Sequence, residues 1–328
     1  MGGEFDVISS TFTRMADKRP SLLLLTAGRD VFLEENLLSI QKQTLAPAQV
    51  ILVNDGKALS DRLIQMAQAC SKKVQILCTA HTCSGQWSAF EVGLKAMGAA
   101  YPFSIIHDDD RLKPDYVETL TRFAQDRMEP WICSHNLEVF HLNSVGNTLI
   151  LPNELRPFVL HDKWEACLHY SRSFLPFPGT CFGIPAAVVS KHLKSEFREM
   201  ADVVLLCECG QQARIFFEPR PIYEYRRHDQ QVSEFMDHAM EDKLQDYLLG
   251  ATRGTGVEAQ VKRNLEKRRA ERFFSWAWES GTFQDYPFRK QFHWIRTLRC
   301  VRNRKLLFAK ICALDFYKNF QSIRGVSQ

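Results

Sequence analysis

Three consecutive carboxylates, Asp108 to Asp110, are the residues whose type and spacing most directly indicate chemistry in this chain. Adjacent carboxylates repel one another, so three in a row are unfavourable unless a cation or strong donors lie among them. Oxygen ligands of this kind suit a hard divalent cation such as Mg²⁺ or Mn²⁺. A solvated acidic turn is the alternative, because charged runs are common on surfaces. The apolar segment before the carboxylates and the helix start at Pro114 after them favour the cation site.

The segment before the carboxylates, Ser104 to Ile106, is typical of the end of a buried strand. The same pattern predicts strands at Ser21 to Thr26, Gln49 to Val53 and Val74 to Leu77, separated by helices at Leu33 to Thr44, Leu63 to Ala69, Ser88 to Met97 and Asp115 to Asp126. Strands that alternate with helices predict an α/β fold with a mostly parallel central sheet flanked by helices. Ligands bind at the carboxyl ends of the strands in such sheets.

The second half of the chain has a less regular pattern. We predict strands at Trp131 to Cys133, Leu137 to Phe140, Arg214 to Phe217 and Ile222 to Arg226, a helix at Ala201 to Ala213, and a pocket-edge loop at Phe174 to Thr180. Beyond residue 235 the chain becomes helical, basic and rich in aromatic residues. The prediction is therefore an N-terminal extension at 1–19, an α/β domain at 20–235 and a basic helical C-terminal region at 236–328.

The composition is that of an ordinary globular protein, with 328 residues of which 45% are hydrophobic and 24% charged. Its ten cysteines include no CxxC pair, which favours reduced thiols over a disulfide framework or a zinc site. The N-terminus lacks the pattern of a signal peptide, and no apolar run is long enough to span a bilayer. We therefore expect a cytoplasmic protein.

The net charge of +4 conceals an asymmetry, because residues 251–328 carry 17 Lys and Arg against 6 Asp and Glu. Three roles are open for this basic region. It could be a helical cap that needs no partner, a peripheral membrane contact at the inner face of the membrane, or a nucleic-acid-binding segment. No recognised nucleic-acid-binding module accompanies the charge, so we expect no nucleic-acid partner.

Six motifs occur in the order in which the family-2 glycosyltransferases carry them, and the chain resembles that family. These enzymes have the A-type nucleotide-diphospho-sugar transferase fold. The motifs are Leu25 to Arg29 with Leu37 to Thr44, Asn54 to Lys57, Cys83 to Leu94, Asp108 to Tyr116, Ala201-Asp202, and a closing block with Tyr225, Arg227, His228, Gln231 and Ser233. Single positions depart from the pattern: Asn54 replaces an Asp, His107 stands where many members have an additional acid, and Ala201 replaces a Glu.

The resemblance implies that a sugar is transferred, with inversion, from a nucleotide-diphospho-sugar. Among these donors, a UDP-sugar is the first expectation. The acceptor would be a hydroxyl of a saccharide or lipid-linked saccharide in surface-polysaccharide synthesis. It further implies that Asp202 is the catalytic base and that Asp108, Asp110 and His228 bind an Mn²⁺ or Mg²⁺ ion. The residues that would contact the donor are Thr26, Arg29, Asp55, Asp108 and Asp109.

Purely structural roles stay open for several of these residues. Asp202 could be a helix N-cap, Asp55 a turn residue, Arg29 a cap on a helix face, and His228 an ordinary surface histidine. Three other functions also stay open. They are the same fold acting on a protein acceptor, a nucleotide-sugar-binding protein without turnover, and a metal-dependent nucleotidyl or phosphoryl transferase.

Overall fold

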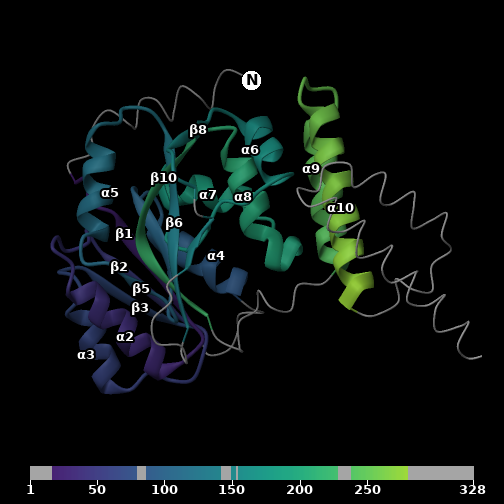
Figure 1. Ribbon diagram of the computed structural model, residues 1–328. Helices are drawn as coiled ribbons and strands as arrows, with labels where there is room; N and C mark the ends of the chain where they lie inside the picture. Colours follow the sequence, from purple (N-terminus) through teal and green to yellow (C-terminus); the bar gives the residue numbers. More distant parts are fainter. Residues whose placement is uncertain (1–16, 80–85, 142–148, 153, 228–237, 280–328) are drawn as a thin grey trace, which may run out of the picture. The chain divides into compact units, whose positions relative to one another are not determined.

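The computed structural model describes residues 17–79, 86–141, 149–152, 154–227 and 238–279 (Figure 1). The chain divides into two compact units, the first ending at Val257 and the second beginning at Glu258. Helix α9 (His238–Thr252), which the prediction assigned to the C-terminal region, contacts η2 (Ser195–Met200) and α6 (Lys163–Tyr170) within the first unit. The described part of the second unit is the helix α10 (Glu258–Glu279).

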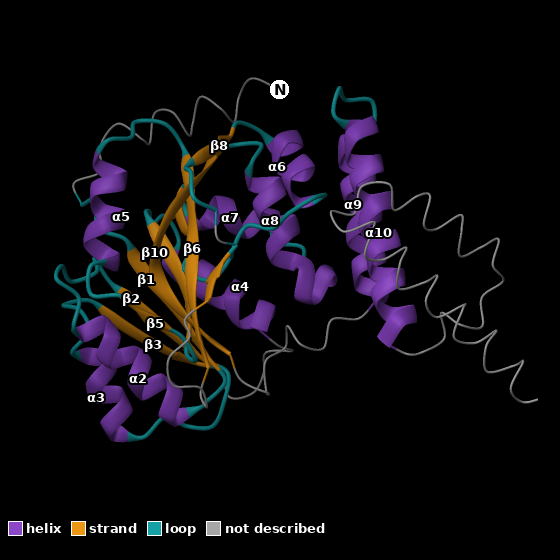
Figure 2. Ribbon diagram, in the orientation of Figure 1, coloured by secondary structure: helices purple, strands orange, loops and turns teal. Residues whose placement is uncertain are grey.

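The first unit is built on a mixed central sheet with the strand order β3-β2-β1-β4-β9-β6-β10-β5, in which β7 pairs with β6 and β8 with β10 (Figure 2). The strands are β1 (Ser21–Thr26), β2 (Val50–Asn54), β3 (Val74–Cys78), β4 (Phe103–His107), β5 (Arg111–Leu112), β6 (Trp131–His141), β7 (Leu149–Leu151), β8 (Phe158–Leu160), β9 (Cys181–Gly183) and β10 (Arg214–Arg227). The long strands pair in parallel and the short ones, β5, β7, β8 and β9, are antiparallel to their neighbours. The predicted α/β class with a largely parallel sheet is confirmed.

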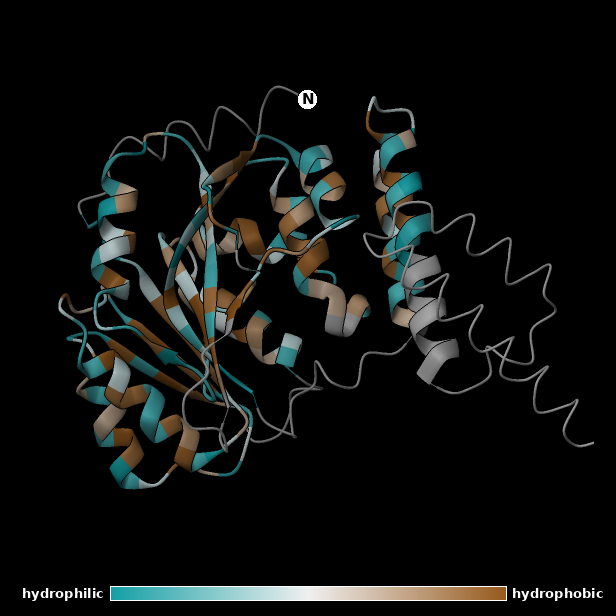
Figure 3. Ribbon diagram, in the orientation of Figure 1, coloured by the Kyte–Doolittle hydropathy of each residue, from teal (hydrophilic) through white to brown (hydrophobic). Residues whose placement is uncertain are grey.

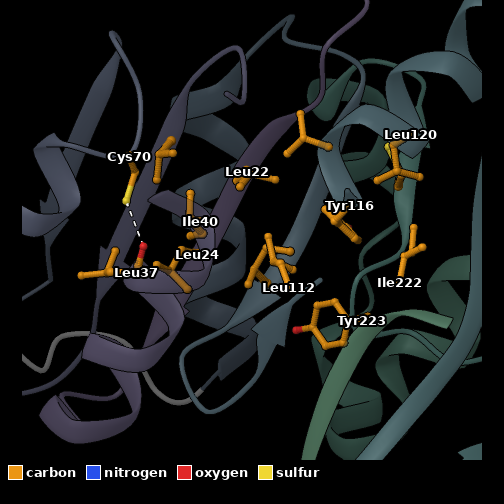
Figure 4. Packing of buried hydrophobic residues seen from close by; sticks show 14 of the residues in the cluster. Leu22, Leu24, Leu37, Ile40, Cys70, Leu112, Tyr116, Leu120, Ile222 and Tyr223 are labelled. Carbon is orange, nitrogen blue, oxygen red and sulfur yellow. Dashed lines mark hydrogen bonds between the residues drawn. The ribbon is translucent and has the colours of Figure 1, made fainter. Parts of the chain in front are cut away.

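Helices cover both faces of the sheet (Figure 1). They are α2 (Asp30–Gln41), α3 (Asp61–Gln68), α4 (Gln86–Met97), α5 (Tyr116–Gln125), α6, α7 (Ala186–His192) and α8 (Ala201–Cys209). On one face, Leu22 and Leu24 of β1 pack with Leu37 of α2 and Leu120 of α5 (Figure 4). On the other face α4 approaches β1 closely, because a Cβ on Gly93 would lie 2.3 Å from a methyl group of Leu23.

Strand β1 shows why the buried strands could be predicted. Its six residues, SLLLLT, are all buried, and successive side chains alternate between the two covered faces of the sheet. Hydropathy colouring shows hydrophobic residues along strands of the sheet, and mixed colouring along α2 and α3 (Figure 3). A continuous apolar run is expected wherever helices cover both faces.

Strands β6 and β10 differ from the prediction, because each is one long strand where two short ones were expected. Strand β10 contains Pro219 and Pro221, and proline usually argues against a strand interior. The two prolines lie in an irregular stretch between Glu218 and Tyr223, where the register against β6 shifts. Neither proline has a register partner on β6, and the pairing resumes at Tyr223. Among the described helices, none is long and apolar enough to span a membrane.

Candidate active site

Polar residues gather at the carboxyl ends of three neighbouring parallel strands. Thr26 ends β1, Asn54 ends β2 and His107 ends β4. The three aspartates follow β4 directly, and Asp108 continues the pairing by donating its backbone N–H to Leu25 O at 3.0 Å. Asp108 and Asp110 are completely buried and Asp109 is 8% exposed. The aspartates are therefore part of the interior, and the alternative of a solvated acidic turn is wrong.

Asp108 is engaged by residues of β1 and the turn after it. Its Oδ2 accepts hydrogen bonds from Thr26 Oγ1 at 2.6 Å and from the Ala27 backbone N–H at 3.3 Å. Its Oδ1 forms an ion pair with the Arg29 guanidinium, whose Nη1 also lies 2.9 Å from Asp109 Oδ2. Burial works to lower the pKa of Arg29, but the charges of Asp108 and Asp109 outweigh it and raise that pKa. Arg29 thus neutralises part of the charge of the turn.

Asp110 is held by β10 on the other side. Its Oδ2 accepts from the Tyr223 hydroxyl at 2.9 Å, and its Oδ1 accepts from the Arg226 backbone N–H at 2.9 Å. Burial, followed by the charge of Asp109, raises the pKa of Asp110 well above its ordinary value. A raised pKa means that the surroundings stabilise the carboxylate poorly, which a bound cation would correct.

The backbone of the acidic turn is fixed by α2 and β10. Asn36 Nδ2 donates to the carbonyl oxygens of His107 at 2.9 Å and of Asp110 at 2.8 Å. The buried Arg226 donates its Nε–H to Asp109 O at 2.7 Å and forms an ion pair with Glu35. Its guanidinium also lies 4.7 Å from the ring centroids of both Phe32 and Phe140. The three aspartates therefore have little freedom to rearrange.

His107, Asp109 and Asp110 each offer a ligand atom, and these atoms lie within 4.8 Å of one another. His107 Nε2 also lies 3.3 Å from Gln86 Nε2. Burial lowers the pKa of His107, although the charges of Asp109 and Asp108 oppose that shift, so the ring is neutral at pH 7. One neutral imidazole and two carboxylates form a donor set for a divalent cation. The residues present therefore fit a metal ion.

The ends of β1 and β2 pack closely together. Asn54, which replaces the usual Asp, stabilises the turn after β2 with its own side chain. Its Nδ2 donates to Lys57 O at 2.9 Å, and its Oδ1 accepts from Gly56 N–H at 3.1 Å. A Cβ on Gly56 would lie 2.4 Å from the Ala27 carbonyl, so only glycine fits there. The next residue, Asp55, accepts through Oδ1 from Thr79 Oγ1 at 2.5 Å.

Asp202 lies in the first turn of α8, after the N-cap residue Met200. Its Oδ1 accepts from the Val203 backbone N–H at 2.8 Å, so Asp202 is not itself the N-cap. Burial raises its pKa to about 6. Burial raises the pKa of nearby Tyr170, and the charge of Asp202 contributes to that shift. The Tyr170 hydroxyl in turn donates to Leu175 O at 3.5 Å.

The loop that Leu175 belongs to, residues 174–180, joins the surroundings of α8 to the acidic turn. Phe177 packs with its ring centroid 5.8 Å from that of Trp87 in the first turn of α4. Gly179 has a φ of +73°, and a Cβ there would lie 2.4 Å from Cδ2 of Tyr223, the residue that binds Asp110. This loop was predicted as a pocket edge, and its residues contact Tyr170 on one side and Tyr223, the partner of Asp110, on the other.

The predicted metal ligands and the observed cluster overlap only in part. Asp110 belongs to the cluster and Asp108 does not; Asp108 is bound by Thr26 and Arg29 instead. His228 lies outside the described residues. His107 was noted as a departure from the family pattern but was not predicted as a ligand, although its position directly before the aspartates was a signal.

The closing motif needs a correction. It was matched at Tyr225 and Arg227 with loose spacing, but Tyr223 and Arg226 are the residues that contact the acidic turn. When Tyr223 and Arg226 are taken as the Tyr and Arg of the motif, Tyr-x-x-Arg-x-His fits the sequence up to His228 with no extra residue. Two tyrosines, Tyr223 and Tyr225, lie two residues apart on β10, and the sequence alone did not distinguish them. Burial decides between them, because Tyr223 is fully buried, so the match at Tyr225 was wrong.

Comparisons with known proteins concern the fold and the class of enzyme. No protein-family model matches the chain. An uncharacterized glycosyltransferase of Haemophilus influenzae is 20% identical over 229 residues, which cover 66% of this chain and 68% of that protein. The crystal structure of S. aureus TarS 1–349 superimposes with a TM-score of 0.57 at 13% identity, over 85% of this chain and 79% of that one. The same TarS fragment with UDP gives 0.57, and with UDP-GlcNAc 0.56.

The order of the motifs, the architecture of the sheet and the curated relative agree with one another. The chain has the A-type fold of nucleotide-diphospho-sugar transferases and is a glycosyltransferase.

Proposed function

We propose that this glycosyltransferase moves a sugar from a nucleotide-diphospho-sugar to an acceptor hydroxyl with inversion, and that it requires a divalent cation. The cluster of His107, Asp109 and Asp110 at the carboxyl ends of the parallel strands carries this proposal. The donor class is supported by the TarS structures, which have the same fold and contain UDP or UDP-GlcNAc. A UDP-sugar is therefore the first donor to test.

The cation is proposed to be Mn²⁺ or Mg²⁺, held by Asp109 and Asp110 beside His107. When bound, it supplies Lewis-acid stabilisation of the negative charge that develops on the leaving diphosphate. The charge of the turn favours such binding. Asp108 and Asp109 share the guanidinium of Arg29, Asp110 is held by hydrogen bonds from Tyr223 and the Arg226 backbone, and the guanidinium of Arg226 is paired with Glu35. Arg29 holds Asp109 in place, and Tyr223 and the Arg226 backbone orient Asp110.

The nucleotide is proposed to lie over the ends of β1 and β2. Thr26 Oγ1 donates to Asp108 and accepts from the Gly28 N–H at 3.0 Å, so Thr26 shapes the turn beneath the donor. The Asp55 carboxylate is oriented by Thr79 and is suited to accept a hydrogen bond from the ribose or a pyrimidine. Both side chains lie at the strand ends where open α/β sheets bind ligands.

Asp202 is proposed as the general base that takes the proton of the acceptor hydroxyl. With a pKa of about 6 it is ionised at pH 7 and is a stronger base than an ordinary aspartate. One displacement assisted by one base inverts the anomeric configuration. The single carboxylate at this position supports an inverting mechanism.

The acceptor is proposed to be a saccharide or a lipid-linked saccharide of a surface polysaccharide. The basic C-terminal region supports a place at the inner face of a membrane, because Lys262 and Arg263 of α10 are exposed. Basic residues on a helix bind anionic lipid headgroups. Protein acceptors are the alternative, and product analysis by mass spectrometry would distinguish them.

Release of nucleoside diphosphate from a panel of nucleotide-sugars, with Mn²⁺ present, tests the proposal. We expect turnover of one donor, reduced by about a hundredfold or more in Asp110→Asn because a cation ligand is lost. Asp115→Asn is the matched control, since Asp115 pairs with Arg220 outside the cluster. Equal rates in the Asp110→Asn variant and the parent would contradict the proposal. Release of pyrophosphate instead of nucleoside diphosphate would indicate nucleotidyl transfer.

A further inference from the structure

We propose that the His107 imidazole binds the divalent cation directly and that this nitrogen ligand makes the site prefer Mn²⁺ and later transition metals over Mg²⁺. The inference rests on the proposed function, because it concerns the same cation. It goes further in naming a ligand and a selectivity that the aspartates alone do not predict. The cluster that carries it contains two carboxylate oxygens and one ring nitrogen within 4.8 Å of one another.

The position of the His107 ring is set by its backbone and by α4. The His107 N–H donates to the Tyr223 hydroxyl at 3.3 Å, and its carbonyl accepts from Asn36 Nδ2 at 2.9 Å. Gln86, the first residue of α4, lies 3.3 Å from Nε2. The hydroxyl of Tyr223 also binds Asp110, so one side chain aligns a nitrogen ligand and an oxygen ligand. Contacts of this kind orient metal ligands and tune their affinity.

The remaining aspartate, Asp108, is not part of the cluster. Its Oδ1 forms an ion pair with the Arg29 guanidinium, and its Oδ2 accepts hydrogen bonds from Thr26 and from the Ala27 N–H. The described side chains that form the cluster are one imidazole and two carboxylates. Carboxylates and water suit Mg²⁺, which takes oxygen ligands in near-ideal octahedra, whereas imidazole suits transition metals. Affinity at such a site rises from Mn²⁺ to Co²⁺.

Metal titrations without nucleotide provide the first measurement. The full chain should bind Co²⁺ more tightly than Mn²⁺, and Mn²⁺ more tightly than Mg²⁺. In His107→Asn the preference for Mn²⁺ over Mg²⁺ should fall by about tenfold or more, the size of effect that altered metal surroundings produce. His161→Asn replaces an exposed histidine outside the cluster and should leave the ratio unchanged. Circular dichroism and the melting temperature establish that each variant is folded.

Pulsed electron paramagnetic resonance of the Mn²⁺-loaded chain provides the second measurement, which does not depend on activity. Nitrogen-14 modulation from a coordinated imidazole should be present in the parent, absent in His107→Asn and present in His228→Asn. Modulation that persists in His107→Asn, or an unchanged ratio of Mn²⁺ to Mg²⁺ affinity, would overturn the role of His107. Failure of the parent to bind Mn²⁺ at all would overturn the proposed metal dependence as well, so the two failures are distinguishable.

Discussion

Three identical residues in a row have three different environments. Asp108 is paired with Arg29 and Thr26, Asp109 shares Arg29, and Asp110 is bound by β10. These partners lie between 79 and 116 positions away in the chain. Sequence reasoning predicted a cation site at these carboxylates from their mutual repulsion. It could not assign the roles of the three, because only the fold decides which partner each side chain meets.

Asp202→Asn should separate catalysis from folding. An amide cannot accept the acceptor's proton, so we expect turnover to fall by about a hundredfold or more while nucleotide affinity is retained. In the parent, kcat/KM should decrease as the pH falls below about 6, where Asp202 becomes protonated. Asp162→Asn is the control, because Asp162 caps α6 and asparagine caps equally well. Unchanged turnover in Asp202→Asn would exclude Asp202 as the base.

The same substitution should make the protein more stable at high pH. The pKa of Asp202 is higher in the folded state, about 6, than its ordinary value of 3.8, so the folded state binds the proton more tightly. Ionisation of Asp202 therefore destabilises the fold above pH 6, and this penalty disappears as the pH falls towards 4. Asp202→Asn should melt at a higher temperature than the parent at pH 8 and at an equal temperature at pH 4. Differential scanning calorimetry at both pH values measures this.

At the scale of elements, β10 and the 174–180 loop hold the acidic turn from one side. The loop fits only because Gly179 has no side chain: a Cβ would lie 2.4 Å from Tyr223 Cδ2 and 2.9 Å from His135 Nε2. The Gly179 carbonyl also accepts from the Tyr116 hydroxyl at 2.7 Å. Displacement of Tyr223, whose ring and hydroxyl are drawn in Figure 4, would move the group that orients Asp110. We therefore expect a change at Gly179 to affect the position of Asp110 through Tyr223.

Gly179→Ala tests this coupling, and Gly254→Ala is its matched control. Both glycines have positive φ, +73° and +75°, so alanine costs about 1–2 kcal/mol of backbone strain at either position. Only Gly179 also meets a side chain, since nothing lies within 4 Å of a Cβ at Gly254. We expect Gly179→Ala to lose more unfolding free energy in urea than Gly254→Ala, and to bind Mn²⁺ about tenfold more weakly. Equal Mn²⁺ affinities would show that Tyr223 does not transmit the change.

The sequence predicted the elements well where one local pattern decides the structure. The strand Ser21–Thr26 was placed correctly because both of its faces are covered and its apolar run is continuous. The prediction divided strand β10 in two, because its prolines signal a break. In the structure β6 continues beside β10 through the irregular stretch. The two-residue strand β5 exists only through its pairing with β10, so its own residues carry no strand signal.

At the scale of the whole molecule, charge separates the two units. The basic residues concentrate after residue 250, and the preceding residues are acidic overall. A basic region of this kind steers a protein towards anionic surfaces, and each basic residue near a membrane contributes about 1 kcal/mol. A lipid-linked acceptor would be concentrated at the same surface. The proposed acceptor and the proposed membrane contact therefore support one another.

Flotation of the full chain with vesicles tests this contact. We expect binding to vesicles that contain phosphatidylserine and none to pure phosphatidylcholine, with affinity falling as salt is added. The double substitution Lys262→Glu and Arg263→Glu removes two exposed basic residues, so binding should weaken by about thirtyfold. Lys72→Glu with Lys73→Glu is the control, since this pair is equally exposed in the acidic unit. Equal binding by both double variants, or binding that salt does not change, would mean that the basic region is a structural cap and that the acceptor reaches the enzyme from solution.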